Sequence, residues 1–332
     1  MFRFIRSTLS PGAYHGTGKK PPFFEGWYFK LVNSSATERF AVIPGVFVAS
    51  DSKQSQAFVQ FFDGARGEVM VFTYPLNAFA YKPYRLDFSI EYNRFTDRSI
   101  DLNLRNDHLS ISGKIVFKEM VPWEVTLRSP GIMGWYAWAP FMQCYHGVVS
   151  LDHALEGKLQ INDREIDFSN GRGYIEKDWG KAFPSAWVWL QSNHFSAPGT
   201  SLTASVAIIP WIRGSFPGFI IGLWHKNHLY RFATYTGAKM VRLDIGDNEL
   251  LWIVEDKTHR LEIQARGSDK VGMLHAPSTQ GMTRRIAETL DGEVHVRLFS
   301  NGKFVLEDHG KHAGMELVGD LKRLVEMWEA KK

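Results

Sequence analysis

The sequence predicts an all-β protein made of two similar antiparallel barrels, followed by one C-terminal helix. Three observations predict this fold class: hairpin-type dipeptides, short strand-like runs rich in β-branched and aromatic residues, and an ordered internal repeat. The regular alternation of strands and helices that a dinucleotide-binding fold would need is missing from the sequence.

Tight turns separate the expected strands. Asp and Asn tolerate positive φ better than most residues and Gly tolerates it freely, so Asp-Gly and Asn-Gly pairs favour two-residue hairpins. The chain contains Asp63-Gly64, Asn170-Gly171, Asp291-Gly292 and Asn301-Gly302. The strand-like runs cover residues 39–43, 57–62, 202–209, 219–224, 250–254 and 293–299.

The internal repeat divides the chain into two comparable units. In segments 23–33 and 183–193, Phe, Trp and Asn recur at the same spacing. Further matches follow in the same order and pair 41–44 with 207–210, 72–74 with 233–235, 155–159 with 290–294, and 173–176 with 314–317. We therefore expect a first barrel over residues 1–180 and a second barrel, with the C-terminal helix, over 181–332. Closure removes exposed strand edges, and a barrel of about eight to ten strands can enclose one small apolar ligand.

One helix is expected at the C-terminus. Apolar residues recur there at helical spacing on one face, namely Leu317, Leu321, Leu324, Val325 and Trp328. The polar positions carry both charge signs, which favours a helix docked on the protein over one that lies on a membrane surface.

Composition excludes several classes of protein. The 332 residues include 39 Lys+Arg and 35 Asp+Glu, a net charge of +4 with basic residues scattered along the chain, so nucleic acid is not expected as a partner. A single cysteine, Cys144, excludes an intramolecular disulfide framework and Cys-rich metal sites. The pairs His225/His228 and His309/His312 lack an acidic third ligand at a recognisable distance, so no metal is expected.

The sequence contains neither a membrane-spanning apolar run nor a secretory or transit pattern at its start, and we expect a cytoplasmic protein. Its pI near 9.0 leaves peripheral association with an anionic membrane surface open. Aromatic residues make up 14% of the chain, which indicates wide cores or a binding site for an apolar ligand.

Two segments resemble a known family. Residues 23–30, FFEGWYFK, and residues 174–184, YIEKDWGKAFP, followed by WVWLQ at 187–191, are similar to the two signatures of tocopherol cyclases. Fragments 229–232, 261–266 and 274–279 resemble the C-terminal half of the same family. The resemblance covers nearly the whole chain, except about 51–131.

The resemblance implies two tandem lipocalin-like barrels and a cyclisation. These enzymes convert a prenylated benzoquinol into a chromanol without redox change and without a cofactor. Their more distant relatives, the carotenoid hydratases, add water to an isolated double bond. An apolar prenylated quinol or related isoprenoid is therefore the expected substrate; the sequence leaves its tail length and the oligomeric state open.

Ring closure on a trisubstituted alkene needs a Brønsted acid, π faces near the developing cation and a dry cavity. The signatures offer three acids, Glu25, Glu176 and Asp178. On a strand, Glu176 and Asp178 share one face, so one of the two carboxyls is expected to stay protonated. We favour Asp178 as proton donor with Glu176 as its partner, Glu176 being the alternative acid, and His194 as the residue that orients or deprotonates the phenol. The expected substrate-binding aromatic residues are Trp27, Tyr28, Trp179, Trp187 and Trp189.

Structural roles are the alternative for each of these residues. Glu25 and Glu176 could be buried acids paired with Lys30, Lys177 or Arg172, and the tryptophans could be core residues. At the level of function, two alternatives to the cyclase remain: a non-catalytic binding protein for an apolar isoprenoid, and a hydratase of the same fold.

Overall fold

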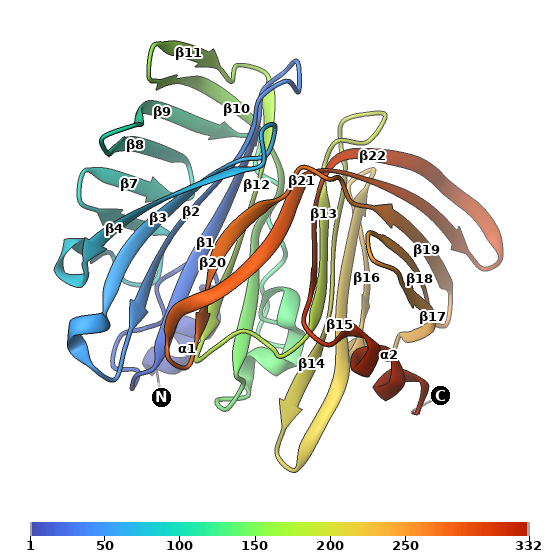
Figure 1. The fold of residues 1–332 in the computed structure, drawn as a ribbon. Coiled ribbons are helices and arrows are strands. Elements are labelled where there is room, and N and C mark those ends of the chain that lie inside the picture. Colours follow the sequence, from blue (N-terminus) through green and yellow to red (C-terminus); the bar gives the residue numbers. More distant parts are fainter. Residues whose placement is uncertain (1, 331–332) are drawn as a thin grey trace. The chain divides into compact units, whose positions relative to one another are not determined.

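The computed structural model describes residues 2–330, and it is built mainly of antiparallel strands (Figure 1). The strand-like runs expected from the sequence all lie inside observed strands. The chain divides into two compact units. Unit 1 comprises Met1–Phe183 and Leu274–Arg285, and unit 2 comprises Pro184–Met273 and Ile286–Lys332. The expected boundary at residue 180 lies close to this junction, but the hairpin 274–285 was expected in the second half and belongs to unit 1.

Unit 1 contains one antiparallel sheet in the order β4-β3-β2-β1-β12-β10-β9-β8-β7-β6-β5, with β11 added beside β10. Its strands are β1 Phe23–Val32, β2 Arg39–Val48, β3 Gln56–Asp63, β4 Glu68–Pro75, β5 Phe79–Tyr81, β6 Asp87–Ile90, β7 Asn93–Thr96, β8 Ser99–Arg105, β9 Ser110–Lys118, β10 Cys144–Ile161, β11 Arg164–Asp167 and β12 Gly171–Gly180. The short helices are α1 Phe2–Thr8, η1 Ser52–Gln54, η2 Leu76–Ala78 and η3 Gly131–Trp138. Its core consists of apolar side chains from this sheet, including Trp27, Phe29 and Ile175.

The second sheet repeats this arrangement with the order β16-β15-β14-β13-β22-β21-β19-β18-β17, and β20 pairs with β21. Its strands are β13 Trp187–Ser192, β14 Thr200–Trp211, β15 Gly214–His225, β16 His228–Ala233, β17 Lys239–Ile245, β18 Glu249–Glu255, β19 His259–Arg266, β20 Gly272–Ser278, β21 Gly281–Ser300 and β22 Lys303–Val318. The short helix η4 covers Thr234–Thr236 and α2 covers Leu321–Glu329. Most of β20 and the start of β21 are part of unit 1, where Gln60 exchanges two hydrogen bonds with the backbone of His275.

The two strand orders confirm the internal repeat. Strands β1 to β4 correspond to β13 to β16, and β12 corresponds to β22, next to the first strand of each series. Trp27 lies opposite Lys177 and Trp187 opposite Val318, so the register also makes Gly173 equivalent to Gly314, as the sequence matches predicted. Each order ends on two different strands, β4 and β5 or β16 and β17, and closure of the sheets into barrels stays a prediction.

Of the four expected hairpin turns, Asn301-Gly302 is confirmed. Asn301 and Gly302 have φ of 49° and 73° and connect β21 to β22. Asp63-Gly64 begins a longer turn between β3 and β4, and Asn170-Gly171 lies between β11 and β12, which do not pair with each other. Asp291-Gly292 is not a hairpin turn: it lies inside β21, where the pairing with β22 shifts register. The pair therefore marks an irregularity within the strand and does not reverse the chain.

The C-terminal helix is docked on unit 2, but it is shorter than the sequence pattern indicated. Leu317 belongs to β22, and α2 begins at Leu321 after Asp320, whose side chain accepts a hydrogen bond from the Arg323 backbone N–H. Leu324 and Trp328 are buried against the core of unit 2. Within residues 2–330, none of the helices has the length and apolar character needed to cross a bilayer.

Candidate functional site

Strand pairing places the two family signatures side by side in unit 1. β12 lies between β1 and β10, with Trp27 opposite Lys177, Glu25 and Tyr145 both opposite Trp179, and His146 opposite Asp178. Because side chains alternate across a sheet, Glu25, Trp27, Lys177 and Trp179 lie on one face. Tyr28, Glu176, Asp178 and His146 lie on the other. The predicted site residues that belong to unit 1 therefore lie on two opposite faces of the sheet.

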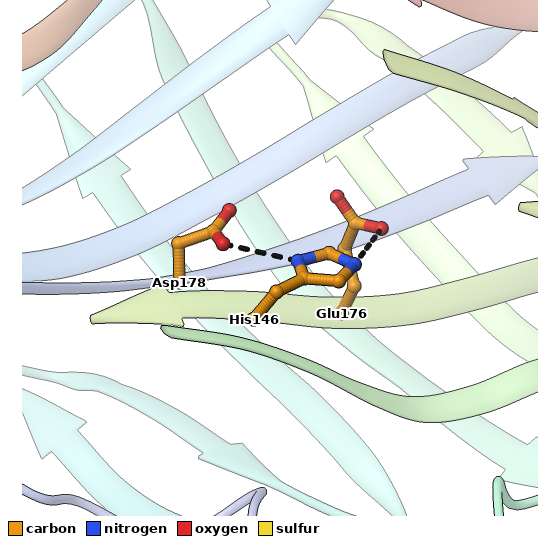
Figure 2. A group of neighbouring side chains, drawn as sticks. All are labelled: His146, Glu176 and Asp178. Carbon is orange, nitrogen blue, oxygen red and sulfur yellow. Dashed lines mark hydrogen bonds and ion pairs between the residues drawn. The ribbon is translucent and has the colours of Figure 1, made fainter. Parts of the chain in front are cut away.

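The first group, called the His146 cluster, consists of His146, Glu176, Asp178 and Tyr174. The imidazole lies between the two carboxylates, with Nδ1 3.0 Å from Asp178 Oδ1 and Nε2 3.6 Å from Glu176 Oε2 (Figure 2). The Tyr174 hydroxyl donates a hydrogen bond of 2.5 Å to the same Glu176 oxygen. Glu176 and Asp178 were expected to lie close together, and in the structure His146 contacts both.

The side chains of the His146 cluster differ in solvent exposure. Tyr174 is fully buried and the side chain of Glu176 is 6% exposed, whereas that of Asp178 is 28% exposed. Asp178 Oδ1 faces His146, and the Cys144 thiol lies 4.0 Å from the same oxygen. Burial and the Asp178 carboxylate raise the pKa of Cys144 well above its ordinary value, so its side chain stays a thiol. Asp178 is the carboxyl of the cluster that a substrate could reach.

The second group, called the Lys177 cluster, is a buried charged centre. The side chains of Lys177 and Glu25 are 0% exposed and form an ion pair. Lys177 Nζ also lies 4.5 Å from the centre of the Trp27 ring and 4.7 Å from that of Trp179. His15, from the segment that precedes β1, stacks on Trp179 at 4.2 Å. Cation–π contacts and the ion pair together compensate the loss of hydration.

The hydrogen bonds of this cluster assign its protons. His15 Nε2 lies 3.2 Å from the Ser7 carbonyl, which can only accept, so this nitrogen carries the proton. Burial and the Lys177 ammonium lower the pKa of His15 and outweigh Glu25, so the neutral ring is favoured. With Nε2 protonated, Nδ1 is the acceptor, and it also lies 3.2 Å from Glu25 Oε1. Lys177 Nζ then donates to Nδ1 at 3.1 Å, to the Ala13 carbonyl at 2.5 Å and to Glu25. All three N–H donors of the ammonium are satisfied.

Glu25 is therefore not suited to act as a proton donor, although the sequence proposed it as a catalytic acid. Burial alone would raise the pKa of Glu25, but the Lys177 ammonium and the His15 side chain hold the pKa below its ordinary value. In addition, the His15 backbone N–H lies 3.0 and 2.8 Å from the two Glu25 carboxylate oxygens. An ionised carboxylate with these partners corresponds to the alternative, a structural acid paired with Lys177.

The predicted aromatic residues are distributed over three places. Trp27 and Trp179 hold Lys177, so their π faces are already used by a cation. Tyr28 lies directly opposite Glu176, on the face of the His146 cluster. Trp187 and Trp189 are buried in β13 of unit 2, where Trp187 Nε1–H donates to Glu316 at 2.6 Å.

His194 also belongs to unit 2 and is not part of the His146 cluster. Its Nδ1 lies 2.9 Å from Asn193 Oδ1, and its ring meets His312 edge-on at 5.5 Å. The role of His194 toward the phenol stays a prediction.

Sequence reasoning missed His146 and His15 as site residues, and it named Lys177 only as a possible ion-pair partner of Glu25 or Glu176. The sequence contained a signal for His146, because it lies in a strand-like segment, two residues from both Cys144 and Val148 and just before an apolar run. Its alignment with Asp178 depends on the pairing of β10 with β12, which the sequence does not specify. His15 had no comparable signal, since it lies in a segment without regular secondary structure.

The His146 cluster also has the composition of a cation site, although no metal was expected. One ligand atom from each of His146, Glu176 and Asp178 lies within 4.8 Å of the others. In this arrangement, however, the two nitrogens of His146 face different carboxylates, so its ring bridges the acids and does not direct one lone pair at a common centre. The geometry favours proton exchange between the three groups.

Comparisons with known proteins agree with this architecture. A sequence model of the family described as tocopherol cyclase-like matches residues 110–319. The chain is 25% identical over 382 aligned positions to the chloroplastic tocopherol cyclase of Zea mays, and the alignment covers 95% of this chain and 78% of that protein. Among solved structures, CghA has a TM-score of 0.57 at 10% identity, with 90% of this chain and 89% of that chain covered. Kievitone hydratase from Nectria haematococca has a TM-score of 0.50 at 11% identity, with 94% and 93% covered. At such identities the structural likeness shows the fold alone.

Proposed function

The chain belongs to the tocopherol cyclase-like family, and on this premise we propose that it is an enzyme that closes a chromanol ring on a prenylated benzoquinol. The reaction is an acid-catalysed, redox-neutral addition of the phenol across an alkene. The observation that carries the proposal is the His146 cluster, which joins two carboxyls, an imidazole and a phenol hydroxyl on two neighbouring strands.

Asp178 is the proposed proton donor. Protonated Asp178 gives its proton to one alkene carbon, a tertiary carbocation forms at the other, and the substrate phenol oxygen attacks it. The new C–O bond leaves the phenolic proton to be removed, and the cluster takes it up, so that one proton is delivered and one recovered. The step uses no electrons from outside and no cofactor.

The neighbours of Asp178 support this cycle. His146 lies within hydrogen-bond distance of Asp178 and can return a proton to it. Glu176 accepts the Tyr174 hydroxyl hydrogen bond and holds the far side of the imidazole, so it acts as a positioning residue with a reserve role as acid. Tyr28 is the aromatic residue best placed near the developing cation, because it lies on the same face opposite Glu176. Substrate binding by Trp187 and Trp189, and a role of His194 toward the phenol, stay predictions.

The proposal is tested with purified protein and a prenylated benzoquinol, with chromanol measured by chromatography and mass spectrometry. Asp178→Asn keeps the shape but cannot supply the proton, so the rate is expected to fall about 10² to 10⁴-fold. Asp167→Asn, at an exposed position of β11, is the matched control and is expected to retain full activity. Wild-type rates in both Asp178→Asn and Glu176→Gln would overturn the site assignment.

The products separate the alternatives. A hydratase would trap the same cation with water and release the tertiary alcohol in place of the chromanol. A non-catalytic binding protein would retain the isoprenoid unchanged, with equal affinity in the wild type and Asp178→Asn.

A further inference from the structure

Unit 1 exposes an aromatic and basic surface outside the proposed active site. Its apolar members come from α1 and from the segment around η3, and they are widely exposed: Phe2 at 90%, Leu127 at 68%, Trp135 at 48% and Phe4 at 45%. Single exposed apolar residues are common on protein surfaces, but a group of them indicates an interaction surface.

Contacts link α1 to the segment around η3. The ring of Phe4 packs against that of Trp138 at 5.9 Å, and Trp138 Nε1–H donates to the Leu127 carbonyl at 3.1 Å. Trp135 lies on the same short helix as Trp138. Arg3 donates to the Thr17 carbonyl at 2.7 Å, which links residues 17–20 to α1. We call this group the aromatic–basic patch.

The charge of the patch is strongly one-sided. Segments 2–20 and 121–142 contain five basic residues and one acidic residue, Glu124, so their net charge equals the +4 of the whole chain. The basic residues are exposed, namely Arg3, Arg6, Lys19, Lys20 and Arg128. Positive charge around exposed Phe and Trp is complementary to an anionic lipid surface, where aromatic rings enter the interface and cations meet phosphate groups.

We propose that the aromatic–basic patch docks unit 1 on an anionic lipid surface. A second copy of the chain fits the patch less well, because the same excess of positive charge would face itself. The described helix α1 has seven residues, so it can lie in the interface but cannot span a bilayer. The proposal goes beyond the proposed chemistry, and it concerns binding that can be measured without substrate.

The test is co-sedimentation of the full chain with vesicles of phosphatidylcholine alone or mixed with phosphatidylglycerol. We expect binding to the mixed vesicles that weakens as salt is raised. Phe2→Ser/Trp135→Ser and Arg3→Ser/Arg6→Ser are each expected to weaken it about tenfold or more. The matched control is Ile212→Ser/Phe304→Ser, which removes exposed apolar side chains from unit 2 and is expected to bind as the wild type.

Three results would overturn the proposal. One is the absence of binding to anionic vesicles; another is undiminished binding by both patch variants. The third is a concentration-dependent dimer that the patch variants abolish, because a second copy would then cover the patch. Near-UV circular dichroism of each variant verifies the fold, and turnover of detergent-dispersed quinol reports separately on the proposed chemistry.

Discussion

Lys177 carries a buried positive charge whose three donors each meet an acceptor, Ala13, His15 and Glu25. Burial lowers the pKa of Lys177 to about 8, against the opposing effect of Glu25. The ion pair with Glu25 and the hydrogen bonds offset this effect of burial. They also connect the segment around His15 to β1 and β12. Because β12 also carries Glu176 and Asp178 of the His146 cluster, the buried ion pair fixes the sheet on which the proposed chemistry takes place.

Replacing Lys177 by Met is expected to reduce the free energy of unfolding by about 3–5 kcal/mol, because Glu25 would remain buried without its counter-ion. The double variant Glu25→Gln/Lys177→Met should recover much of the loss. Urea unfolding measures both. Lys158→Met, which breaks the exposed pair with Glu165, is the control and should change stability little. A Lys177→Met protein as stable as the wild type would contradict the role given to this pair.

At the scale of the element, β12 decides the site because it presents different chemistry on its two faces. Odd positions supply Lys177 and Trp179 to one cluster, and even positions supply Tyr174, Glu176 and Asp178 to the other. The strand ends at Gly180, which has φ of 155°. A Cβ atom there would lie 2.2 Å from the Gln143 carbonyl oxygen, closer than real atoms approach. Glycine thus permits the close pairing of β12 with the start of β10, where His146 lies.

Gly180→Ala is expected to destabilise the protein by more than about 1 kcal/mol, because alanine fits neither the backbone angle nor the space. It should also lower chromanol formation, since the displaced strands carry His146 and Asp178. The control is Gly214→Ala, where an added Cβ meets no described atom within 4 Å. Thermal unfolding and the cyclisation assay are the measurements, and an unchanged melting temperature and rate in Gly180→Ala would refute the packing argument.

For the whole molecule, each unit has its own apolar core, and unit 1 also buries a histidine. His153 Nδ1 lies 3.0 Å from Ser150 Oγ, whose own proton goes to the Asp152 carbonyl. Among the described residues, His153 Nε2 has no hydrogen-bond partner. Burial and the nearby Arg172 lower the pKa of His153 to about 3. The imidazole stays neutral in the folded protein far below the pH at which it becomes charged in the unfolded chain.

The sign of the pH effect follows from this difference. Between about pH 6.5 and 3 the unfolded chain binds a proton at His153 that the folded protein does not, so stability falls as the pH falls. At pH 5 this residue alone is expected to cost about 2 kcal/mol relative to pH 8. The lowered pKa values of His15, His225 and His275 act in the same direction. Urea unfolding at both pH values should therefore show a smaller difference for His153→Gln than for the wild type; an equal difference would contradict the prediction.

Local sequence patterns were sufficient to predict the six strand segments, the turn at Asn301-Gly302 and the internal repeat. Alternation and turn preferences depend on residues that are neighbours in the chain. They were also sufficient for placing Glu176 and Asp178 on one face. They did not find His146, and they did not show that Glu25 and Trp27 lie on the opposite face of the sheet from Glu176 and Asp178. Such errors arise because a sequence shows which residues share a face of one strand, but it does not show which strands become neighbours.

The sequence by itself determined the antiparallel β architecture, the two repeated units, the family and the two carboxyls of the proposed site. Only the tertiary structure decided that His146 bridges those carboxyls and that Glu25 forms an ion pair with Lys177. The physical reason is that the protonation state of a side chain depends on the groups within a few ångströms of it. Those neighbours come from β1, β10 and the segment around His15, which the fold brings to β12 from distant parts of the chain.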